Sequence, residues 1–523
     1  CARRRNSFPA ASFVAILPAL FPTRMASNSD SSSTARTAAL LAAFLGWMFD
    51  GFEMGLFPLT GRDALKELLA GEAAGTLNNW FGVIMAMFLV GAATGGVVFG
   101  WLGDRIGRVK AMSLSIFTYA IFTGLCGIAK HAEEIAAYRF IASLGMGGEW
   151  SLGVALVNEV WPGKSRMLVA GLIGAAANVG YLLGGFLSLG LASVLGTVNN
   201  ALLSVGLGQE TVTTLLSNNG WRILMMSGAV PAFLVFFIQI FVREKKKWEE
   251  EKAKGSTDHW ATKDLLGVLI GCASALAIVW VWAPKSITIA TPVAILVTVV
   301  GLVITLLGYL YPVWQYLGRA GSEDPGASRP FIIKRMLLGA GLAGVALMGT
   351  WGAVQWAPKW AEELAGNPAL HAKDWAQIWT ATGAIIFTMV AALMGDRLGR
   401  RVTYSIICVA TITAALLFYQ TNSTYTNWFL FTGFLIGGIS ASFYGFFPLY
   451  FPELFPTQVR ATGQGFCFNF GRVLAAIGAL QTANLMNYFG GSFAKAGSVL
   501  CFIYLLGIVV VWFAPETKGK ELS

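Results

Sequence analysis

Charged residues are scarce in this chain, at 12% of 523 residues, whereas a soluble domain carries about a quarter. Hydrophobic residues make up 56% and gather in long runs. Runs of about 20 apolar residues cross about 30 Å of hydrocarbon as a helix. The low charge therefore excludes a soluble globular protein and predicts an all-α membrane protein.

Histidine and cysteine are also few, at three and six residues. The cysteines are scattered, and no Cys-x-x-Cys pair or histidine partner stands at the spacing of a metal site. No nucleophile, base and metal constellation appears in the sequence. We therefore expect no metal, no cofactor and no enzymatic activity.

The apolar runs predict about fourteen membrane spans. They fall at 38–60, 79–102, 110–129, 134–158, 167–195, 221–242, 265–283, 288–311, 335–358, 375–395, 402–420, 427–451, 461–488 and 497–514. The expected segments are a disordered tail (1–37), a six-helix bundle (38–242), a charged cytoplasmic linker (243–264), an extra helix pair (265–311), a cytoplasmic linker (312–333), a second six-helix bundle (334–514) and a cytoplasmic tail (515–523). Residues 1–24 precede the first methionine, Met25, and we expect them to be non-native; a signal peptide after Arg3–Arg5 is the alternative.

The net charge of +10 follows from basic residues in short loops. They form no aromatic-interleaved patch, so we expect no nucleic-acid partner. If every run crosses, the loops of one side hold most of the lysine and arginine, which marks the cytoplasmic side. We expect an inner-membrane monomer with both termini in the cytoplasm.

One motif occurs twice, each time after the second helix of a half. Gly100-Trp-Leu-Gly-Asp-Arg-Ile-Gly-Arg108 matches Ala392-Leu-Met-Gly-Asp-Arg-Leu-Gly-Arg400, and 396 minus 104 gives an offset of 292 between the aspartates. Glu159-x-x-Pro-x-x-x-Arg166 matches Glu453-x-x-Pro-x-x-x-Arg460 at 453 minus 159, or 294. Two motifs with nearly one offset indicate an internal duplication.

The residue types of these motifs suggest a latch between two bundles. Glycine lets helix ends turn closely, and carboxylates bind arginines or the amides at a helix start. Simple positive-inside anchoring is the alternative reading. The candidate latch residues are Gly100, Asp104, Arg105, Gly107, Arg108, Glu159, Arg166, Asp396, Arg397, Gly399, Arg400, Glu453 and Arg460.

With these motifs the chain resembles the major facilitator superfamily from about residue 38 to the end. Gly100–Lys110 resembles the signature loop of that superfamily, and Arg139–Trp150 resembles its fourth-helix motif. Trp221-Arg222 with Pro231, and Pro515–Gly519, resemble the sugar-porter and organic-acid-symporter branches. The resemblance implies two six-helix bundles that alternate access to a central site.

Two further comparisons refine the resemblance. Asp50-Gly-Phe-Glu53 is similar to the Asp-Gly-Phe-Asp of the aromatic-acid and sialate proton symporters. The Gln-Gln-x-x-Gly-x-Asn of sugar porters is absent from Arg335–Trp360, and the central helix pair is an addition to the family pattern.

Ionisable groups deep in a membrane are costly and therefore functional candidates. Asp50 and Glu53 lie three residues apart on one helix face, where close acids can take up and release a proton. Arg139 is their expected partner, since related proton-coupled sugar porters pair an acid of the first helix with this arginine. A static ion pair is the alternative.

Arg472 lies twelve residues beyond Arg460, about 18 Å into its helix. No acid stands nearby on that helix, so a substrate carboxylate is the expected partner, and organic-acid symporters carry an arginine at a similar position. Pairing with Glu149, Asp50 or Glu53 is the alternative. Further candidates for substrate contact are Glu149, Asn178, Gln355, Trp356, Tyr444 and Asn469, although packing alone would explain each of them.

These residues predict a secondary transporter that carries a small organic anion, such as a monocarboxylate, an aromatic acid or a sugar acid, together with protons. A sugar or polyol transporter is the second reading. A transporter-like nutrient receptor is a third and weaker one.

Overall fold

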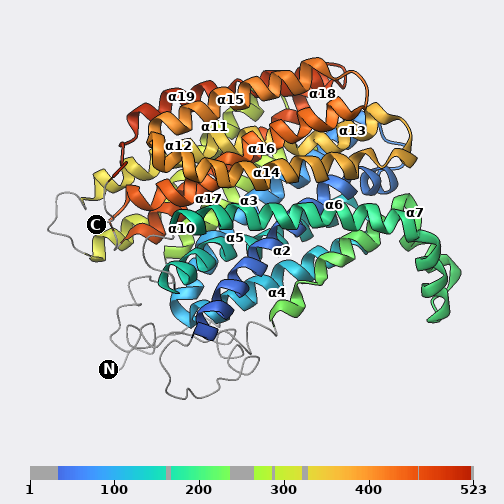
Figure 1. Cartoon of the computed structure of the whole chain (residues 1–523), viewed down its shortest axis with the longest axis horizontal. Helices are drawn as coiled ribbons and strands as arrows, with labels where there is room; N and C mark the ends of the chain where they lie inside the picture. The colour runs from blue at the N-terminus through green and yellow to red at the C-terminus, as the bar shows by residue number, and fades with distance from the viewer. Residues whose placement is uncertain are drawn as a thin grey trace, which may run out of the picture.

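The computed structural model describes residues 33–160, 166–235, 264–284, 289–320, 328–456 and 459–519. Every regular element within these ranges is a helix, as predicted (Figure 1). The first half consists of α2 (Ser33–Leu68), α3 (Ala74–Ile106), α4 (Arg108–Cys126), α5 (Ala132–Val160), α6 (Arg166–Ser204) and α7 (Gln209–Met226).

The second half contains two helices that are broken into pieces. It comprises α12 (Arg329–Gly352), α13 (Ala357–Ala365), α14 (Ala372–Leu398), α15 (Arg400–Thr421), α16 (Asn427–Tyr450), α17 (Arg460–Tyr488), α18 (Phe493–Leu500) and α19 (Ile503–Phe513). A 3-10 turn, Val354–Trp356, separates α12 from α13. α18 and α19 are separated only by the residues around Cys501.

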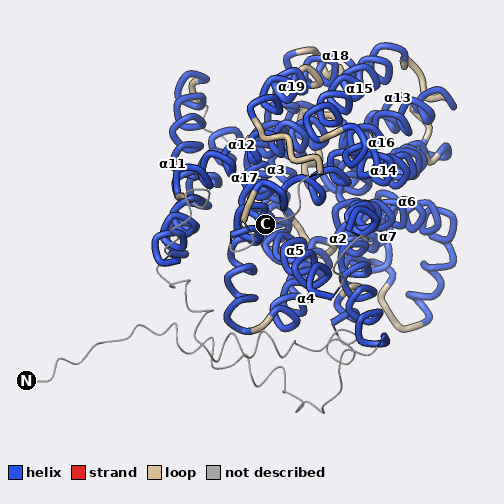
Figure 2. Tube along the Cα trace, turned by 60° about the vertical axis from the view of Figure 1, so that its left-hand side comes forward, coloured by secondary structure: helices blue, strands red, loops and turns tan. Residues whose placement is uncertain are grey.

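Between the halves lies the extra pair, α10 (Leu265–Trp282) and α11 (Thr291–Ala320). Its two helices pack closely at Gly267 and Gly308, where an added Cβ would come within 2.8 Å or less of the facing backbone oxygen. The pair lies to one side of the molecule and packs mainly on α3 (Figure 2). The Thr94 and Tyr309 hydroxyls form a buried hydrogen bond of 2.7 Å between α3 and α11.

The packing repeats in the two halves as the duplicated motifs predict. In the first half α3 packs on α5 and α2 on α6, and in the second half the equivalent helices α14 and α16, and α12 and α17, do the same. The halves meet along α3 with α17 and along α6 with α14. α3 is equivalent to α14, and α17 to α6, so the operation that superposes the halves also exchanges these two interfaces. The space between the two interfaces therefore lies on an approximate two-fold axis.

Ten helical stretches of the described residues are long and apolar enough to cross a membrane. α2, α5 and α17 are not among them; they carry the ionisable residues that the sequence singled out, such as Asp50, Arg139 and Arg472. The expected number of about fourteen membrane spans therefore stays a prediction. The expected linker of residues 243–264 and the expected N-terminal tail lie almost wholly outside the described residues, whereas residues 515–519 of the expected C-terminal tail are described.

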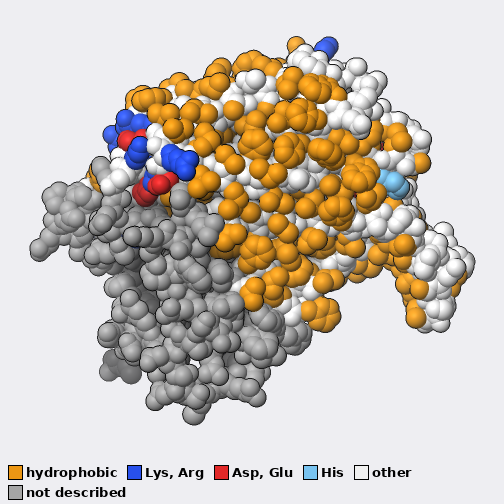
Figure 3. Space-filling model, in the orientation of Figure 1, with side chains coloured by type: hydrophobic (Ala, Val, Ile, Leu, Met, Phe, Trp, Pro, Cys, Tyr) orange, Lys and Arg blue, Asp and Glu red, His pale blue; other side chains and the backbone are white. Residues whose placement is uncertain are grey.

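The two ends of the molecule differ in charge. One end, called here the motif end, holds the turns at Gly107 and Gly399, whose φ angles of 102° and 94° favour glycine. Charged side chains gather near this end, where the C terminus lies, while the rest of the visible face is largely hydrophobic (Figure 3). A largely hydrophobic face of this kind fits a membrane-embedded protein.

α6 extends further than its apolar run of 167–195 predicts, since it continues to Ser204. The added turns contain Gly196, Asn199 and Asn200, which interrupted the apolar pattern. With the start of α7, they form a hairpin that projects at the end opposite the motifs (Figure 1).

Candidate functional site

A cavity lies between the two halves and encloses about 1210 Å³ of empty space, open solvent at its mouth included. Helices of both halves line it, from α2, α3, α5 and α6 on one side to α12, α14, α16 and α17 on the other. Its aromatic lining residues are Trp47, Phe88, Tyr181, Trp351, Tyr444, Phe447 and Phe468. The charged lining residues are Asp50 and Arg472, one from each half.

The break after α12 places polar groups in this cavity. Helical bonding stops at Gly352, and the carbonyl oxygens freed there accept bonds of 2.7 Å from the Thr482 hydroxyl and, at Ala353, 2.9 Å from the Tyr419 hydroxyl. The unwound segment turns Gln355 into the cavity. Non-helical backbone at membrane depth requires such internal partners.

Arg472 is buried, with 8% of its surface exposed. Its Nη1 donates to the Ala92 carbonyl oxygen of the other half and to Asn469 Oδ1, each at 3.2 Å, and its guanidinium lies 4.8 Å from the Phe468 ring centre. Within the described residues it forms no ion pair with a carboxylate, although Asp50 lies within electrostatic range. The guanidinium therefore offers unused donors and charge to an anion.

The two acids of α2 have different surroundings. Glu53 is fully buried and forms an ion pair with Arg139, while the Thr123 hydroxyl donates to Glu53 Oε1 at 2.8 Å. The Arg139 guanidinium also lies 4.5 Å from the Phe88 ring centre. Asp50 does not join this pair and faces the cavity instead.

Glu149 of α5 lies behind Asp50, with 1% of its surface exposed, and does not line the cavity. Its carboxyl group occupies the space above Gly46, where an added Cβ would lie 1.7 Å from Glu149 Oε1. The Asp50 carboxyl group is within hydrogen-bonding reach. Three buried carboxyl groups thus lie along one side of α2.

Of the other predicted contact residues, Asn178, Gln355 and Tyr444 line the cavity. Asn469 does not, but it accepts a bond from Arg472 and fills the space against Gly96 across the interface between the halves. Trp356 packs on Phe81, with ring centres 4.6 Å apart, and also lies outside the cavity lining.

Several lining residues did not stand out in the sequence, among them Trp47, Tyr181 and Trp351. Trp47 lies three residues before Asp50 on α2, so helical spacing from Asp50 would have found it. Trp351 is not related to Gln355 in this way, because the helix breaks between them. The Tyr181 hydroxyl donates to Gln355 Oε1 at 2.7 Å and joins the halves at one end of the cavity.

Beyond Tyr181, a set of polar contacts closes the end opposite the motifs; we call it the clasp. It joins α2 and α3 to α13 and α14, and consists of Arg62, Asp63, Asn78, Lys359, Glu362, Glu363 and Lys373. Asp63 forms an ion pair with Lys373, and Arg62 Nη1 lies 3.6 Å from Glu362 and 3.4 Å from Glu363. Each of these contacts crosses between the halves, so the clasp holds this end shut.

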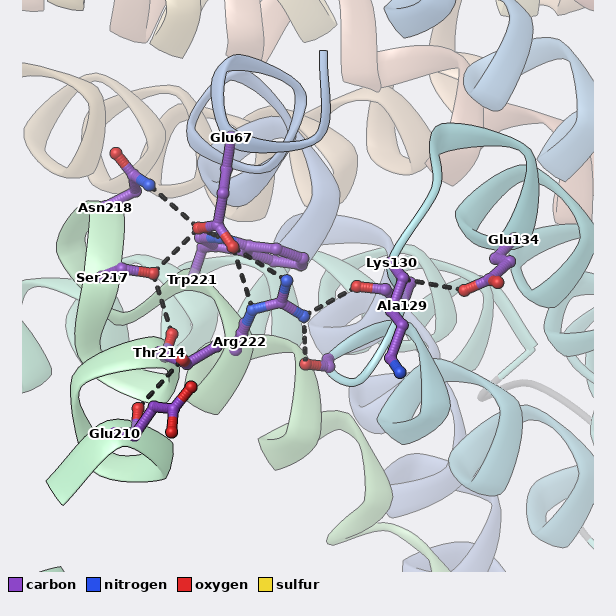
Figure 4. A network of polar contacts seen from close by, with 11 residues as sticks. Glu67, Ala129, Lys130, Glu134, Glu210, Thr214, Ser217, Asn218, Trp221 and Arg222 are labelled. Carbon is purple, nitrogen blue, oxygen red and sulfur yellow. Dashed lines mark hydrogen bonds and ion pairs between the residues drawn. The ribbon is translucent and has the colours of Figure 1, made fainter. Parts of the chain in front are cut away.

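Next to the clasp, Glu67 anchors a kink in α7 (Figure 4). Its carboxylate accepts bonds from Ser217, Asn218 and Trp221 and pairs with Arg222 at 2.8 Å. Burial opposes ionisation of Glu67, but the bonds from Trp221 and its neighbours outweigh it and lower the pKa to about 2. The charged form of Glu67 is therefore part of the folded structure.

At the motif end the second copy of the motif forms a network within its own half. Arg400 Nη2 and Nε bind Glu453 at 2.7 and 2.9 Å, and the backbone N–H groups of Arg400 and Arg401 donate to Glu516. Burial raises the pKa of Glu516, but these N–H bonds outweigh it, and the net pKa is lowered. Glu516 thus caps α15, where the helix start favours a negative charge.

The other candidate latch residues contribute less to this picture. Arg397 and Asp396 are exposed, Arg460 Nε donates to the Pro452 carbonyl oxygen at 3.0 Å, and Arg105 lies over Trp101 at 4.7 Å. Gly100 has open space around it. The side chains of Asp104, Arg108, Glu159 and Arg166 lie outside the described residues, so the latch between the halves stays a prediction.

A family model described as "Sugar (and other) transporter" matches residues 24–267 and 367–523, which leaves out most of the extra pair and also α12 and α13. The chain belongs to this family. It is a multi-pass membrane transporter of the major facilitator superfamily, as the motifs predicted, and its relatives are transporters and not enzymes.

Two curated relatives match over nearly their whole length, and a third matches over about half. The transporter is 25% identical over 488 residues to the cis,cis-muconate transport protein of Acinetobacter baylyi, covering 92% of this chain and 94% of that protein. A putative metabolite transport protein of Haemophilus influenzae is 25% identical over 93% of this chain and 97% of its own length. The sialic acid transporter NanX of Escherichia coli is 28% identical over 41% of this chain and 46% of that protein.

Solved structures share the fold. The proton:xylose symporter XylE bound to 6-bromo-6-deoxy-D-glucose superposes with a TM-score of 0.62 at 18% identity, covering 94% of this chain and 98% of the other. A partially occluded inward-open form of XylE from E. coli gives a TM-score of 0.61 at 17% identity, over 94% and 100% of the two chains.

Proposed function

We propose that this transporter is a proton-coupled symporter of a small organic anion, such as a monocarboxylate, an aromatic acid or a sugar acid. One observation carries the proposal: a buried arginine faces a large aromatic cavity and has no ion pair within the described residues. An arginine binds a carboxylate with two parallel hydrogen bonds, and aromatic walls suit a flat or conjugated acid.

The proposed path uses both ends of the molecule. We place the motif end in the cytoplasm, in line with the basic residues there, so the clasp lies outside and closes an inward-facing state. Substrate binds Arg472, a proton binds near Asp50, and both leave inward once the halves have rocked. The transport of muconate and of sialic acid by similar proteins supports an anionic substrate.

Uptake into proteoliposomes tests this proposal. Labelled muconate, benzoate, sialate and xylose are offered with and without a proton uncoupler, and we expect uncoupler-sensitive accumulation of an acid. Arg472→Gln removes two charged hydrogen bonds at about 1.5–3 kcal/mol each, so uptake falls by roughly 100-fold or more. Arg472→Lys keeps the positive charge but cannot form two parallel hydrogen bonds to a carboxylate, so its uptake should fall nearly as far.

Arg329→Gln is the matched control. The Arg329 guanidinium lies over Trp314 at 5.6 Å, outside the cavity, so this variant should transport normally. Normal acid uptake by both Arg472 variants would refute the anion site.

A sugar or polyol is the second candidate substrate. The amide and hydroxyl groups of Asn178, Gln355 and Ser440 line the cavity and suit a neutral polyhydroxy compound, and the xylose symporter shares the fold. Xylose uptake that is unaffected by Arg472→Gln would favour this candidate over an acid.

A further inference from the structure

Two buried carboxyl groups from different helices face each other beside the cavity. Gly46 and Asp50 lie four residues apart on one face of α2, and the Glu149 carboxyl group fills the space over Gly46. Only a glycine at position 46 leaves room for it, since an added Cβ would lie 1.7 Å from Glu149 Oε1. The backbone thus places Glu149 within hydrogen-bonding reach of Asp50.

Neither carboxyl group has a full set of partners. Within the described residues, both oxygens of Glu149 and Oδ1 of Asp50 lack a hydrogen-bond donor. Two ionised carboxylates side by side in a low dielectric would repel each other, and each would keep unbonded oxygens. A single proton removes both difficulties, because the O–H of one group then donates to an oxygen of the other.

Other charged and titratable groups do not take this role. Glu53 differs from these two carboxyl groups because Arg139 and Thr123 both bind its Oε1, although its Oε2 has no partner within the described residues. Tyr119 faces all three acids from α4, and Arg472 faces Asp50 from the second half. The expectation that Asp50 and Glu53 act as the coupled acids therefore does not fit this geometry as well as Asp50 with Glu149.

We propose that Asp50 and Glu149 together bind the transported proton as an acid pair, while the Glu53–Arg139 ion pair serves as a fixed support. This inference rests on the proposed proton symport. With the proton bound, Asp50 no longer competes for Arg472, which is then free to bind the substrate anion. When the shared O–H bond breaks, the proton passes to water in the open cavity, and the restored carboxylate charge weakens the hold of Arg472 on its substrate.

Infrared spectroscopy of the purified transporter in lipid tests the pair without any transport. At neutral pH we expect a C=O stretching band of a protonated carboxylic acid at a frequency lowered by the shared hydrogen bond, and this band should shift or disappear in both Asp50→Asn and Glu149→Gln, where that bond is broken. Glu133→Gln makes the same chemical change at an exposed position on α5 and should keep the band. A band that is unchanged in Glu149→Gln, or is absent from the wild type, would overturn the pair.

Transport gives a second readout. Glu149→Gln removes the like charge that favours protonation of Asp50, so half-maximal uptake should need an external pH lower by about one unit. Glu149→Gln should also keep counterflow exchange. Gly46→Ala displaces the Glu149 carboxyl group and should change the pH profile in the same direction, which decides the case if Glu149→Gln does not fold. An unchanged pH profile in the variant that folds would refute the pair.

The two proposals can fail separately. If wild-type uptake is insensitive to the uncoupler, proton symport is wrong, whereas the infrared band still reports whether the acids share a proton. If uptake is proton-driven but Glu149→Gln behaves like Glu133→Gln in both measurements, symport stands and the pair is wrong.

Discussion

Lys373→Gln should open the clasp end of the transporter. Lys373 pairs with Asp63 across the halves, and their side chains are only 13% and 5% exposed. Removal of one partner of a buried pair costs about 3–5 kcal/mol, because the other charge stays buried. Asn219 still donates to Asp63 at 3.2 Å, so we expect Lys373→Gln to destabilise the closed clasp by less, about 2–3 kcal/mol.

This cost applies to one conformation only. When the clasp end opens, both charged groups reach water, and the substitution costs little. The balance should therefore shift toward the open state by roughly 30- to 150-fold.

Spin labels measure this shift directly. Glu72 and Ala369 are exposed at the clasp end, one in each half, and take the labels as cysteines in a background whose native cysteines are replaced. Double electron–electron resonance should show a longer distance between them in Lys373→Gln. Lys495→Gln, an exposed lysine of the same end, is the control.

Charge reversal separates the pair from a general loss of packing. Asp63→Lys combined with Lys373→Asp should restore the short distance. An unchanged distance distribution in Lys373→Gln, or no recovery in the double variant, would refute the clasp as an ion-pair closure.

Two further predictions concern stability, read as thermal unfolding of the purified protein. Since the pKa of Glu67 falls from 4.5 to about 2 on folding, its contribution is complete above about pH 4.5 and is lost as the pH falls toward 2. Glu67→Gln should lower stability at pH 7 and flatten this part of the profile, and an unchanged profile would contradict the network in Figure 4. Gly51→Ala should destabilise by about 3 kcal/mol or more, since its Cβ would meet the Ala177 carbonyl oxygen at 1.6 Å, whereas Gly190→Ala meets nothing within 4 Å. Equal stability of the two alanine variants would contradict the close packing of α2 on α6.

The fold was largely predictable because the repeated motifs indicate that the chain consists of two equivalent halves. An offset of 292–294 residues implied that each helix of one half has an equivalent in the other, and the packing of α3 and α14 bears this out. The length of α6 was not predictable from apolar runs, since its last turns leave the hydrophobic region and turn polar.

The pairing of charges was harder to predict than their positions. Glu53 and Arg139 face each other at one level of the antiparallel helices α2 and α5, and Gly46 and Glu149 do so at the next. Along two antiparallel helices the residue numbers rise on one as they fall on the other, so facing residues have a nearly constant sum. The sum is 192 for Glu53 with Arg139 and 195 for Gly46 with Glu149. One sequence does not reveal which faces of the two helices meet, so the choice among Asp50, Glu53 and Glu149 needed the structure.

The projecting hairpin has a practical consequence for imaging. At 1.5 Å per residue the 39 residues of α6 span about 58 Å, well beyond the roughly 30 Å of hydrocarbon. At its tip Val205 is 75% exposed, and Gly206 and Gly208 have nothing near them. A rigid epitope inserted between these glycines would stand clear of both bundles and the clasp, and would serve as a fiducial for particle alignment in electron cryomicroscopy of this small, otherwise membrane-embedded protein.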